Sequence, residues 1–350
     1  MKYHIVLPRP MNLEQLAQDA VDHKRPRHSM WLLGEKLNAK FHEPKASPTT
    51  ALDQIRSKLA SPAEFWALAR DISSQVNSDD CIFCVSEAGG LQVAAVCGAK
   101  PDRPKLCLFV HNLDRPRGRL ALKLWQLSKR VDLFLACSQK QVNFLRQYLN
   151  LPSTKVGFIW DHTDIKFFTP GTPSLSKPRP LIVSVGLEQR DYRTLAAATA
   201  SLNVDVKISG FSKDAALLAK TFPEQLPANM SRRFYEWTEL VQLYTDADVV
   251  VVSVRENSYA AGVQSLMEAM ACQRPVVVTA TEGLQTYLKA DAVTSVKPGD
   301  VEGMQQAILQ ILKHPQQALD QALCGYKLSK ERHDIDIYIE KIATHLQSLS

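Results

Sequence analysis

The stretch "DVVVVSVRENSYAAGVQSLMEAMACQRPVVVTA", residues 248–280, decides the fold. It begins and ends with runs of valine, which are typical of strands buried on both faces of a sheet. Between these runs, apolar residues recur at helical spacing from about Gly262 to Cys272. Two such strands joined by a helix predict a parallel pair, because parallel neighbours need a crossover connection.

The same alternation of short apolar runs and helical patterns extends along the whole chain. Strands are expected at residues 3–8, 81–86, 105–111, 131–138, 155–160, 181–186, 204–210, 248–254 and 275–280. Helices are expected at 27–39, 62–76, 90–98, 138–150, 190–201, 236–246, 262–272, 301–313 and 331–349. The segment 161–180, which has four prolines and no periodicity, predicts a linker. The predicted fold class is therefore α/β, with two doubly wound parallel-sheet domains.

Charge is distributed unevenly along the 350 residues. Residues 1–165 carry 23 Lys and Arg against 16 Asp and Glu, whereas the remainder carries 19 against 20. The first half is therefore expected to meet an anionic partner or surface. Within it, "RPRGRLALKLWQLSKR" (115–130) places six cations around apolar residues and is a candidate helix for an anionic lipid surface. An ordinary helix with a core face and a charged flank is the alternative.

The seven cysteines indicate a reducing compartment, because their number is odd and several lie in apolar runs. Cys81 and Cys84 form a CxxC motif within an expected strand, whose period turns the two thiols to opposite faces and favours core packing. The opening "MKYHIVLPRP" turns polar within ten residues, so no signal peptide is expected. We expect a cytoplasmic protein, with peripheral attachment to the inner face of a membrane as an alternative.

One carboxylate, Glu268, lies within a run of small and apolar residues. The expected helix places Val263, Leu266, Met267 and Met270 on one face and Glu268 on the other. Burying a carboxylate without a partner is costly, so the group would lose its charge. Glu268 therefore either faces solvent or faces a polar group that the protein binds.

Three stretches together resemble the retaining GT-B glycosyltransferases of family four. "GVQSLMEAMACQRPVVVTATEGL" (262–284) is similar to their donor-site signature, in which Glu-Ala-Met-Ala precedes Pro-Val-Val. Residues 131–170 are similar to the strands and helix that lead into the interdomain linker, and "SVGLEQRDYRTLAAA" (184–198) is similar to the Val-Gly…Lys-Gly segment. The resemblance implies a GT-B fold in which two domains face a cleft.

The resemblance also implies a domain organisation. The expected boundaries are an acceptor-side domain at 1–163, a nucleotide-sugar donor domain at 164–330, and a C-terminal helix at 331–350 that packs back on the first domain. The match covers about residues 130 to 350, whereas residues 1–100 match only in their alternation.

The family's functional residues suggest roles for residues of this chain. The resemblance implies that Glu268 accepts hydrogen bonds from the ribose hydroxyls of the donor, which suit the two acceptor oxygens of a carboxylate. Arg190, at the place of a phosphate-binding Lys, and His111, at the place of a cleft histidine, are the catalytic candidates. A solvated helix cap is the alternative for Arg190, and a core histidine for His111. The other donor-binding candidates lie at strand ends and in loops and are Gly186, Gly210, Glu256, Ala261, Gly262 and Val263.

This chain departs from the family pattern at several positions. Ala260 occupies the place of the first Glu of the family's pair, which helps to hold the donor sugar. Glu256, four residues earlier, is a candidate to replace it. Leu187 stands where an Arg is usual, so Arg190 is the only cation at a matched position. The two aspartates of "DHTD" (161–164) are expected to cap the linker rather than to take part in chemistry.

The resemblance implies a retaining enzyme that moves a sugar from a nucleotide sugar to a glycan, lipid-linked or other hydroxyl acceptor. The leaving phosphate would take the acceptor proton, so no carboxylate nucleophile is assigned and no metal or other cofactor is expected. The expected partners are the nucleotide sugar, the acceptor and an anionic membrane surface, but not nucleic acid. A GT-B protein that has lost catalysis and acts as a binding or regulatory module is the main alternative. A nucleotide-sugar epimerase differs in its motifs, and a nicotinamide dehydrogenase would need Gly-x-Gly-x-x-Gly after a strand.

Overall fold

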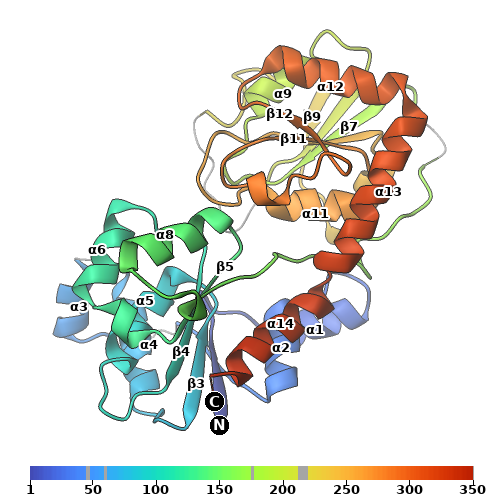
Figure 1. Cartoon of the computed structure of the whole chain (residues 1–350). Helices are drawn as coiled ribbons and strands as arrows, with labels where there is room; N and C mark the ends of the chain where they lie inside the picture. Colours follow the sequence, from blue (N-terminus) through green and yellow to red (C-terminus); the bar gives the residue numbers. More distant parts are fainter. Residues whose placement is uncertain (45–47, 59–60, 175–176, 212–219, 350) are drawn as a thin grey trace. The chain divides into compact units, whose positions relative to one another are not determined.

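A computed structural model describes residues 1–44, 48–58, 61–174, 177–211 and 220–349 (Figure 1). The chain forms two compact units. The first unit comprises Met1–Gln18, His28–Trp160 and Ile339–Ser350, and the second comprises Asp19–Arg27 and Asp161–Tyr338. Each unit contains a six-stranded sheet, and all strand pairs in both sheets are parallel. The predicted α/β fold with two doubly wound sheets is confirmed.

The sheet of the first unit has the strand order β2-β1-β3-β4-β5-β6. Its strands are β1 (Lys2–Val6), β2 (Lys40–His42), β3 (Asp80–Cys84), β4 (Lys105–Val110), β5 (Leu133–Ala136) and β6 (Val156–Phe158). Every residue of the central strand β3 is buried, as expected for a parallel sheet with helices on both faces. Cys81 and Cys84 both lie on β3 and are buried, so the prediction that they pack in the core is confirmed.

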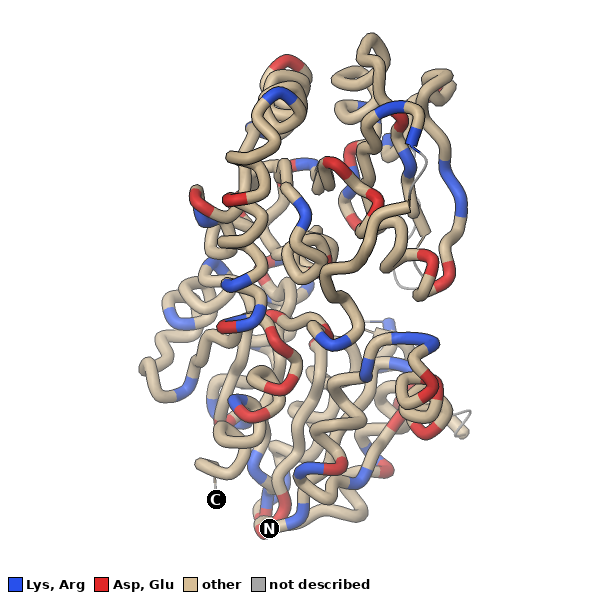
Figure 2. Tube along the Cα trace, turned by 90° about the vertical axis from the view of Figure 1, so that its right-hand side faces the viewer, with Lys and Arg blue, Asp and Glu red and all other residues tan. Residues whose placement is uncertain are grey.

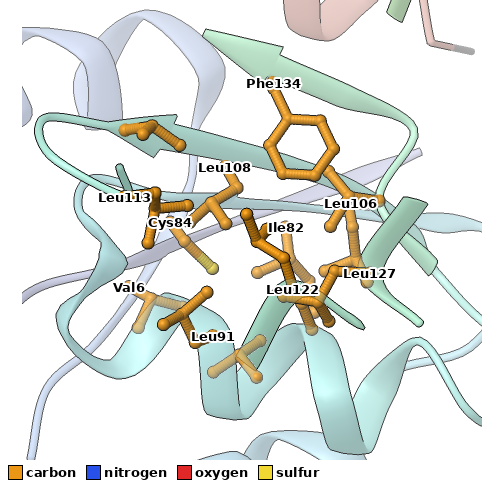
Figure 3. Packing of buried hydrophobic residues seen from close by; sticks show 14 of the residues in the cluster. Val6, Ile82, Cys84, Leu91, Leu106, Leu108, Leu113, Leu122, Leu127 and Phe134 are labelled. Atoms are coloured by element: carbon orange, nitrogen blue, oxygen red, sulfur yellow. The ribbon is translucent and has the colours of Figure 1, made fainter. Parts of the chain in front are cut away.

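Helices cover both faces of this sheet. They are α1 (Leu13–Val21), α2 (Ser29–Leu37), α3 (Ala51–Ser57), α4 (Ala63–Ser73), α5 (Glu87–Cys97), α6 (Pro116–Leu124), α7 (Leu127–Arg130), α8 (Gln139–Leu149) and α14 (Ile335–Gln347). One face packs a core between the strands and helices α4 to α8; Ile82, Leu106 and Phe134 contribute to it (Figure 3). The other face carries α2 and α14, which are joined by an ion pair of 2.6 Å between Lys36 and Glu340 (Figure 1).

The segment predicted as a single helix over 115–130 is broken in the structure. Gln126 adopts a left-handed conformation with φ of 49°, so α6 and α7 are separate helices. Leu127 is fully buried, whereas Leu120 and Leu124 are exposed. The apolar residues of this segment therefore divide between the core and the surface, which a single helical period does not predict.

The sheet of the second unit has the order β12-β11-β10-β7-β8-β9. Its strands are β7 (Leu181–Val185), β8 (Asp205–Ser209), β9 (Met230–Arg232), β10 (Val249–Val252), β11 (Val276–Thr279) and β12 (Thr294–Val296). Its helices are α9 (Tyr192–Thr199), α10 (Trp237–Asp246), α11 (Val263–Ala271), α12 (Val301–Lys313) and α13 (Pro315–Arg332). Helices α9 and α12 pack together on one face of the sheet, and α11 and α13 on the other (Figure 1).

The structure corrects the prediction of one C-terminal helix over 331–349. Helix α13 ends at Arg332 and α14 begins at Ile335, with His333 and Asp334 between them. At this break Asp334 forms a bridge with Thr163, and the His333 ring lies 2.9 Å (Nδ1) from the carbonyl oxygen of Asp161. The three-residue strands β2, β9 and β12 and the helices α1, α3 and α13 were not predicted.

A short strap, residues 19–27, belongs to the second unit although both of its flanks belong to the first. Arg27 ends the strap and forms ion pairs of 2.8 Å with Asp164 and 2.7 Å with Asp336. Asp164 is buried, and its carboxylate also accepts the backbone N–H of Arg27 at 2.9 Å. The expectation that the linker aspartates have a structural role is confirmed for Asp164.

Charged residues are spread over the surface helices and loops of both units (Figure 2). In the described ranges, no helix is long and apolar enough to cross a membrane. No group of three or more His, Cys, Asp or Glu side chains in those ranges is arranged to hold a metal ion.

Candidate active site

The carboxyl edge of the second sheet brings together most of the predicted donor-binding residues. In parallel sheets of this type, ligands bind at that edge. Gly186 follows β7, and its N–H donates to the carbonyl of Ser209, the last residue of β8, at 2.9 Å. Gly210 follows directly, and its carbonyl accepts a hydrogen bond of 2.8 Å from Arg232 at the end of β9. Three neighbouring strand ends are thus linked by short hydrogen bonds.

Two glycines at this edge hold conformations that other residues rarely adopt. Gly186 has φ of 102°, and Gly262, which precedes α11, has φ of 93°. A Cβ atom on Gly186 would lie 2.3 Å from Nη2 of Arg190, and one on Gly262 would lie 2.9 Å from Cγ1 of Val252. Both positions therefore require glycine for the backbone and for space. The loops that contain Gly186 and Gly262 therefore lie in close contact with Arg190 and Val252.

Arg190 occupies the space beneath these two glycines. Its guanidinium donates from Nε to the carbonyl of Val185 at 2.8 Å and from Nη1 to that of Glu188 at 2.9 Å. Nη2 donates to Oγ of Ser265 on α11, also at 2.8 Å. The residue is only 3% exposed, so the alternative of a solvated helix cap is wrong. Asp191 supplies the cap of α9 instead, because its side chain accepts the N–H of Thr194.

Glu268 lies on α11 near Arg190 and is 4% exposed. Its Oε2 accepts a hydrogen bond of 2.7 Å from the hydroxyl of Tyr244, a buried residue of α10. Burial raises the pKa of Glu268 to about 7, although hydrogen bonds from Tyr244 and Gln264 and the charge of Arg190 act in the opposite direction. Glu268 is therefore not a solvent-facing residue. The carboxyl group is therefore about half protonated at neutral pH.

Tyr244 was missed by the sequence analysis. Burial and the neighbouring Glu268 carboxylate raise the pKa of its hydroxyl well above the ordinary value, so it remains a donor. It lies 24 residues before Glu268 on a helix of ordinary amphipathic pattern. No local signal in the sequence marks it.

The loop that enters α11 is held largely by its own backbone. The N–H groups of Ala261 and Val263 donate to the carbonyls of Tyr259 and Ala260 at 2.7 and 3.2 Å, and both side chains are buried. These two N–H groups are therefore engaged within the loop itself.

Glu256 is exposed, in the loop after β10. Its Oε1 accepts the backbone N–H of Asn257 and of Glu282, each at 3.1 Å. The carboxylate thus ties the loop after β10 to the loop after β11. The nearby hydroxyl of Tyr259 donates to the carboxylate of Glu188.

His111 lies in the first unit, at the carboxyl end of β4, and is exposed. The alternative of a core histidine is therefore wrong. The carboxylate of Glu87 accepts the backbone N–H of His111 at 3.0 Å and of Asn112 at 2.9 Å. The ring of Phe109 lies 4.9 Å from that of His111. Glu87, which the sequence analysis did not single out, anchors the loop that carries His111.

Residues 179–314 match the family model described as glycosyl transferases group 1. This range contains every donor-binding candidate of the second unit. Among curated protein sequences, none matches the chain.

Solved structures resemble the whole chain. A glycosyltransferase from Rickettsia africae aligns with a TM-score of 0.71 and 12% identity, covering 100% of this chain and 99% of that one. HepE from Anabaena, solved with UDP and glucose, aligns with a TM-score of 0.71 and 16% identity over 99% of this chain and 100% of that one. The sucrose-phosphate synthase of Thermosynechococcus elongatus aligns with a TM-score of 0.71 and 15% identity, covering 100% of this chain and 99% of that one. The fold is that of GT-B glycosyltransferases, and together with the family match it supports a glycosyltransferase.

Proposed function

We propose that this protein is a retaining glycosyltransferase that uses a nucleotide sugar. The observation that carries the proposal is Glu268, a buried carboxylate that accepts a hydrogen bond of 2.7 Å from Tyr244 and lies near Arg190, which packs beneath the positive-φ glycines Gly186 and Gly262. A carboxylate kept in place by neutral donors retains acceptor capacity for a ribose diol. The family match over 179–314 and the UDP bound in HepE support a nucleotide at this edge.

The donor diphosphate would lie over the glycine loops. A guanidinium buried at 3% exposure acts in surroundings of low dielectric, where its charge reaches further than it would in water. In this proposal Arg190 stabilises the negative charge that develops on the leaving phosphate. It does so from beneath Gly186 and Gly262, and by holding Ser265 at the first turn of α11. The positive end of that helix adds to the same field.

The transfer breaks the bond between the anomeric carbon and the leaving phosphate oxygen. In the proposed front-face reaction, the acceptor hydroxyl forms the new bond on the same face and its proton passes to the departing phosphate. No carboxylate nucleophile and no metal take part. His111, exposed on an anchored loop, would contact the donor sugar and the acceptor. The acceptor is a hydroxyl of a glycan, a lipid-linked sugar or another molecule.

A binding module that has lost catalysis is a second candidate, and one observation favours it. Ala260 occupies the position of a sugar-binding carboxylate in related enzymes, and the nearby carboxylate of Glu256 is engaged by two backbone N–H groups. Such a protein would bind a nucleotide without turning it over.

The experiment is a thermal unfolding series with nucleoside diphosphates and their sugars, starting from UDP and UDP-glucose. A ligand at one hundred times its dissociation constant adds about 2.7 kcal/mol of stability, which shifts the midpoint clearly. Glu268→Gln keeps the shape and the partner of the side chain but removes its charge, and the shift should vanish. Glu331→Gln, an exposed glutamate on α13, serves as the matched control and should leave the shift unchanged.

Hydrolysis or transfer of the stabilising sugar nucleotide then separates the two candidates. Release of the nucleoside diphosphate with retention at the anomeric carbon supports the enzyme, and a chelator should leave the rate unchanged. Binding without release supports the binding module. No shift with any nucleotide would overturn both.

A further inference from the structure

Helix α6 carries apolar residues on its outer side. Leu120 and Leu124, one turn apart, are 58% and 53% exposed. Ala121 and Leu122 fill the core, so the outer leucines are not needed to hold the helix in place. Residues four apart lie on one face of a helix, and these two therefore form a single apolar ridge.

Helix α3 exposes two apolar residues and buries a carboxylate. Leu52 and Ile55 are 52% and 60% exposed, whereas Asp53, between them, is buried. The Asp53 carboxylate accepts the backbone N–H of Thr50, the N-cap residue, at 2.9 Å and forms an ion pair of 3.0 Å with Arg70. A helix that buries its carboxylate and exposes its branched apolar side chains has an outer face suited to an apolar environment.

A groove of about 370 Å³ lies between Arg56 of α3 and Trp125, the residue that follows α6. Its lining includes Trp66 and Trp125, whose rings meet edge to face at 5.2 Å. Arg56 of α3 lies over the Trp66 ring at 5.3 Å, and Arg130 of α7 also lines the groove. Figure 1 shows α3 and α6 on the same side of the first unit. An indole-lined groove between guanidinium groups suits a ligand that is both apolar and anionic.

The charge around α6 is mostly positive, although Asp114, just before the helix, forms an ion pair with Arg119. Residues 115–158 contain nine Lys and Arg and a single acidic residue, Asp132. That aspartate is already paired with Arg103 at 2.7 Å. On the other flank of α6, Lys123 lies 4.6 Å from the ring centre of Tyr148 on α8. The ridge of leucines therefore stands among cations.

We propose that this surface, defined by Leu52, Ile55, Leu120 and Leu124 and called the α3–α6 face, docks on an anionic phospholipid bilayer. The four apolar side chains enter the boundary between headgroups and acyl chains, and the surrounding cations contact lipid phosphates. Charge complementarity decides this occupant, because an apolar ridge bordered by cations matches a surface whose apolar layer lies beneath anions. The inference concerns the first unit alone and does not depend on the nucleotide site.

The test is flotation of the full chain with vesicles of phosphatidylcholine, with or without phosphatidylglycerol. We expect the protein to bind only the vesicles that contain phosphatidylglycerol. Each cation near such a surface contributes roughly fivefold in partitioning, so binding should fall steeply in 1 M salt, where the Debye length is about 3 Å.

Substitutions test whether the apolar residues of the α3–α6 face are needed for vesicle binding. Leu120→Ser with Leu124→Ser should reduce partitioning at least tenfold, and Leu52→Ser with Ile55→Ser should reduce it similarly. The matched control is Leu319→Ser with Leu323→Ser, a leucine pair of the same spacing on α13 of the second unit, 49% and 39% exposed. The control pair should bind like the unchanged protein.

Three outcomes would overturn the inference: no binding to either vesicle, equal binding to both, or equal loss in the control pair. Each variant is also tested for its nucleotide-induced thermal shift. A variant that loses vesicle binding and keeps that shift is folded, so its loss belongs to the α3–α6 face. Failure of the nucleotide shift in all proteins would count against the proposed function and leave the vesicle result standing.

Discussion

The hydroxyl of Tyr244 donates to Oε2 of Glu268 at 2.7 Å, and both side chains are buried within the second unit. The tyrosine occupies one of the two carboxylate oxygens and fixes the orientation of the other. A surface carboxylate would be free to turn; this one has a set direction before any ligand arrives. A preoriented acceptor loses less conformational freedom when it binds.

Tyr244→Phe should therefore weaken both stability and nucleotide binding. Removing a hydrogen bond to a buried charged group costs about 1–3 kcal/mol, and urea unfolding measures this change. A double-mutant cycle with Glu268→Ala, which removes the acceptor, separates the pair from its surroundings. Additive effects of the two changes would show that the contact has no energetic role.

The raised pKa of Glu268, about 7, predicts a dependence of stability on pH. The folded state keeps the proton up to a higher pH than the unfolded state, whose ordinary value is near 4.5. Between these two values the unfolded state binds fewer protons, so the free energy of unfolding falls as pH rises from about 4.5 to 7 and then levels off. The total fall from this group is about 3 kcal/mol. Urea unfolding at several pH values should show this decline in the unchanged protein and in Glu331→Gln, but not in Glu268→Gln.

Nucleotide affinity should change with pH in the opposite direction. Only the ionised carboxylate of Glu268 accepts two hydrogen bonds without supplying a proton, so affinity should rise towards pH 7 and level off above it. Calorimetric titration across this range measures the effect. A flat profile would indicate that the nucleotide does not contact this group.

Gly186→Ala should disrupt the edge of the second sheet. Gly186 and Gly299 both have positive φ, but a Cβ on Gly299 would meet nothing within 4 Å, whereas one on Gly186 would meet Arg190 at 2.3 Å. Both alanine variants carry the backbone penalty of about 1–2 kcal/mol, and Gly186→Ala also displaces the guanidinium. Thermal unfolding should show the larger loss at Gly186, together with loss of nucleotide binding. Equal losses at the two positions would contradict the close packing of Arg190.

His111→Ala should lower the rate of sugar transfer and leave nucleotide affinity unchanged. His111 belongs to the first unit, whereas the donor-binding candidates belong to the second. Misplaced contacts at a reacting centre cost roughly 100-fold in rate. Glu87→Gln, which weakens the anchor of the same loop, should give a smaller loss in kcat. If Glu87→Gln changed nucleotide affinity instead, the role of this loop would need another explanation.

The sequence predicted the longer strands and the need of Glu268 for a polar partner, because both follow from local patterns. The valine runs became β10 and β11, and the helix between them became α11. Tyr244 could not be predicted, since its contact with Glu268 depends on how α10 packs beside α11. The burial of Arg190 was also hidden, because its sequence neighbours are polar and only the fold of two glycine loops covers it.

The helix break at Gln126 has no signal in the sequence, because no proline or glycine marks it. A continuous helix would place Leu120 and Leu127 on the same apolar face. Tertiary packing instead buries Leu127 and leaves Leu120 outside. Periodicity in the sequence therefore predicts single helices and strands. It does not predict where a helix is interrupted or which of its apolar residues are then exposed.

The strap at residues 19–27 means that the second unit is not a continuous piece of the chain. A fragment consisting of residues 161–338 would contain its complete sheet but would lack Arg27, and the buried carboxylate of Asp164 would lose its cation. An exchange of the second unit between related proteins would meet the same obstacle. Recombination at the linker alone would separate Arg27 from Asp164 and Asp336, so residues 19–27 must accompany residues 161–338 for these ion pairs to form.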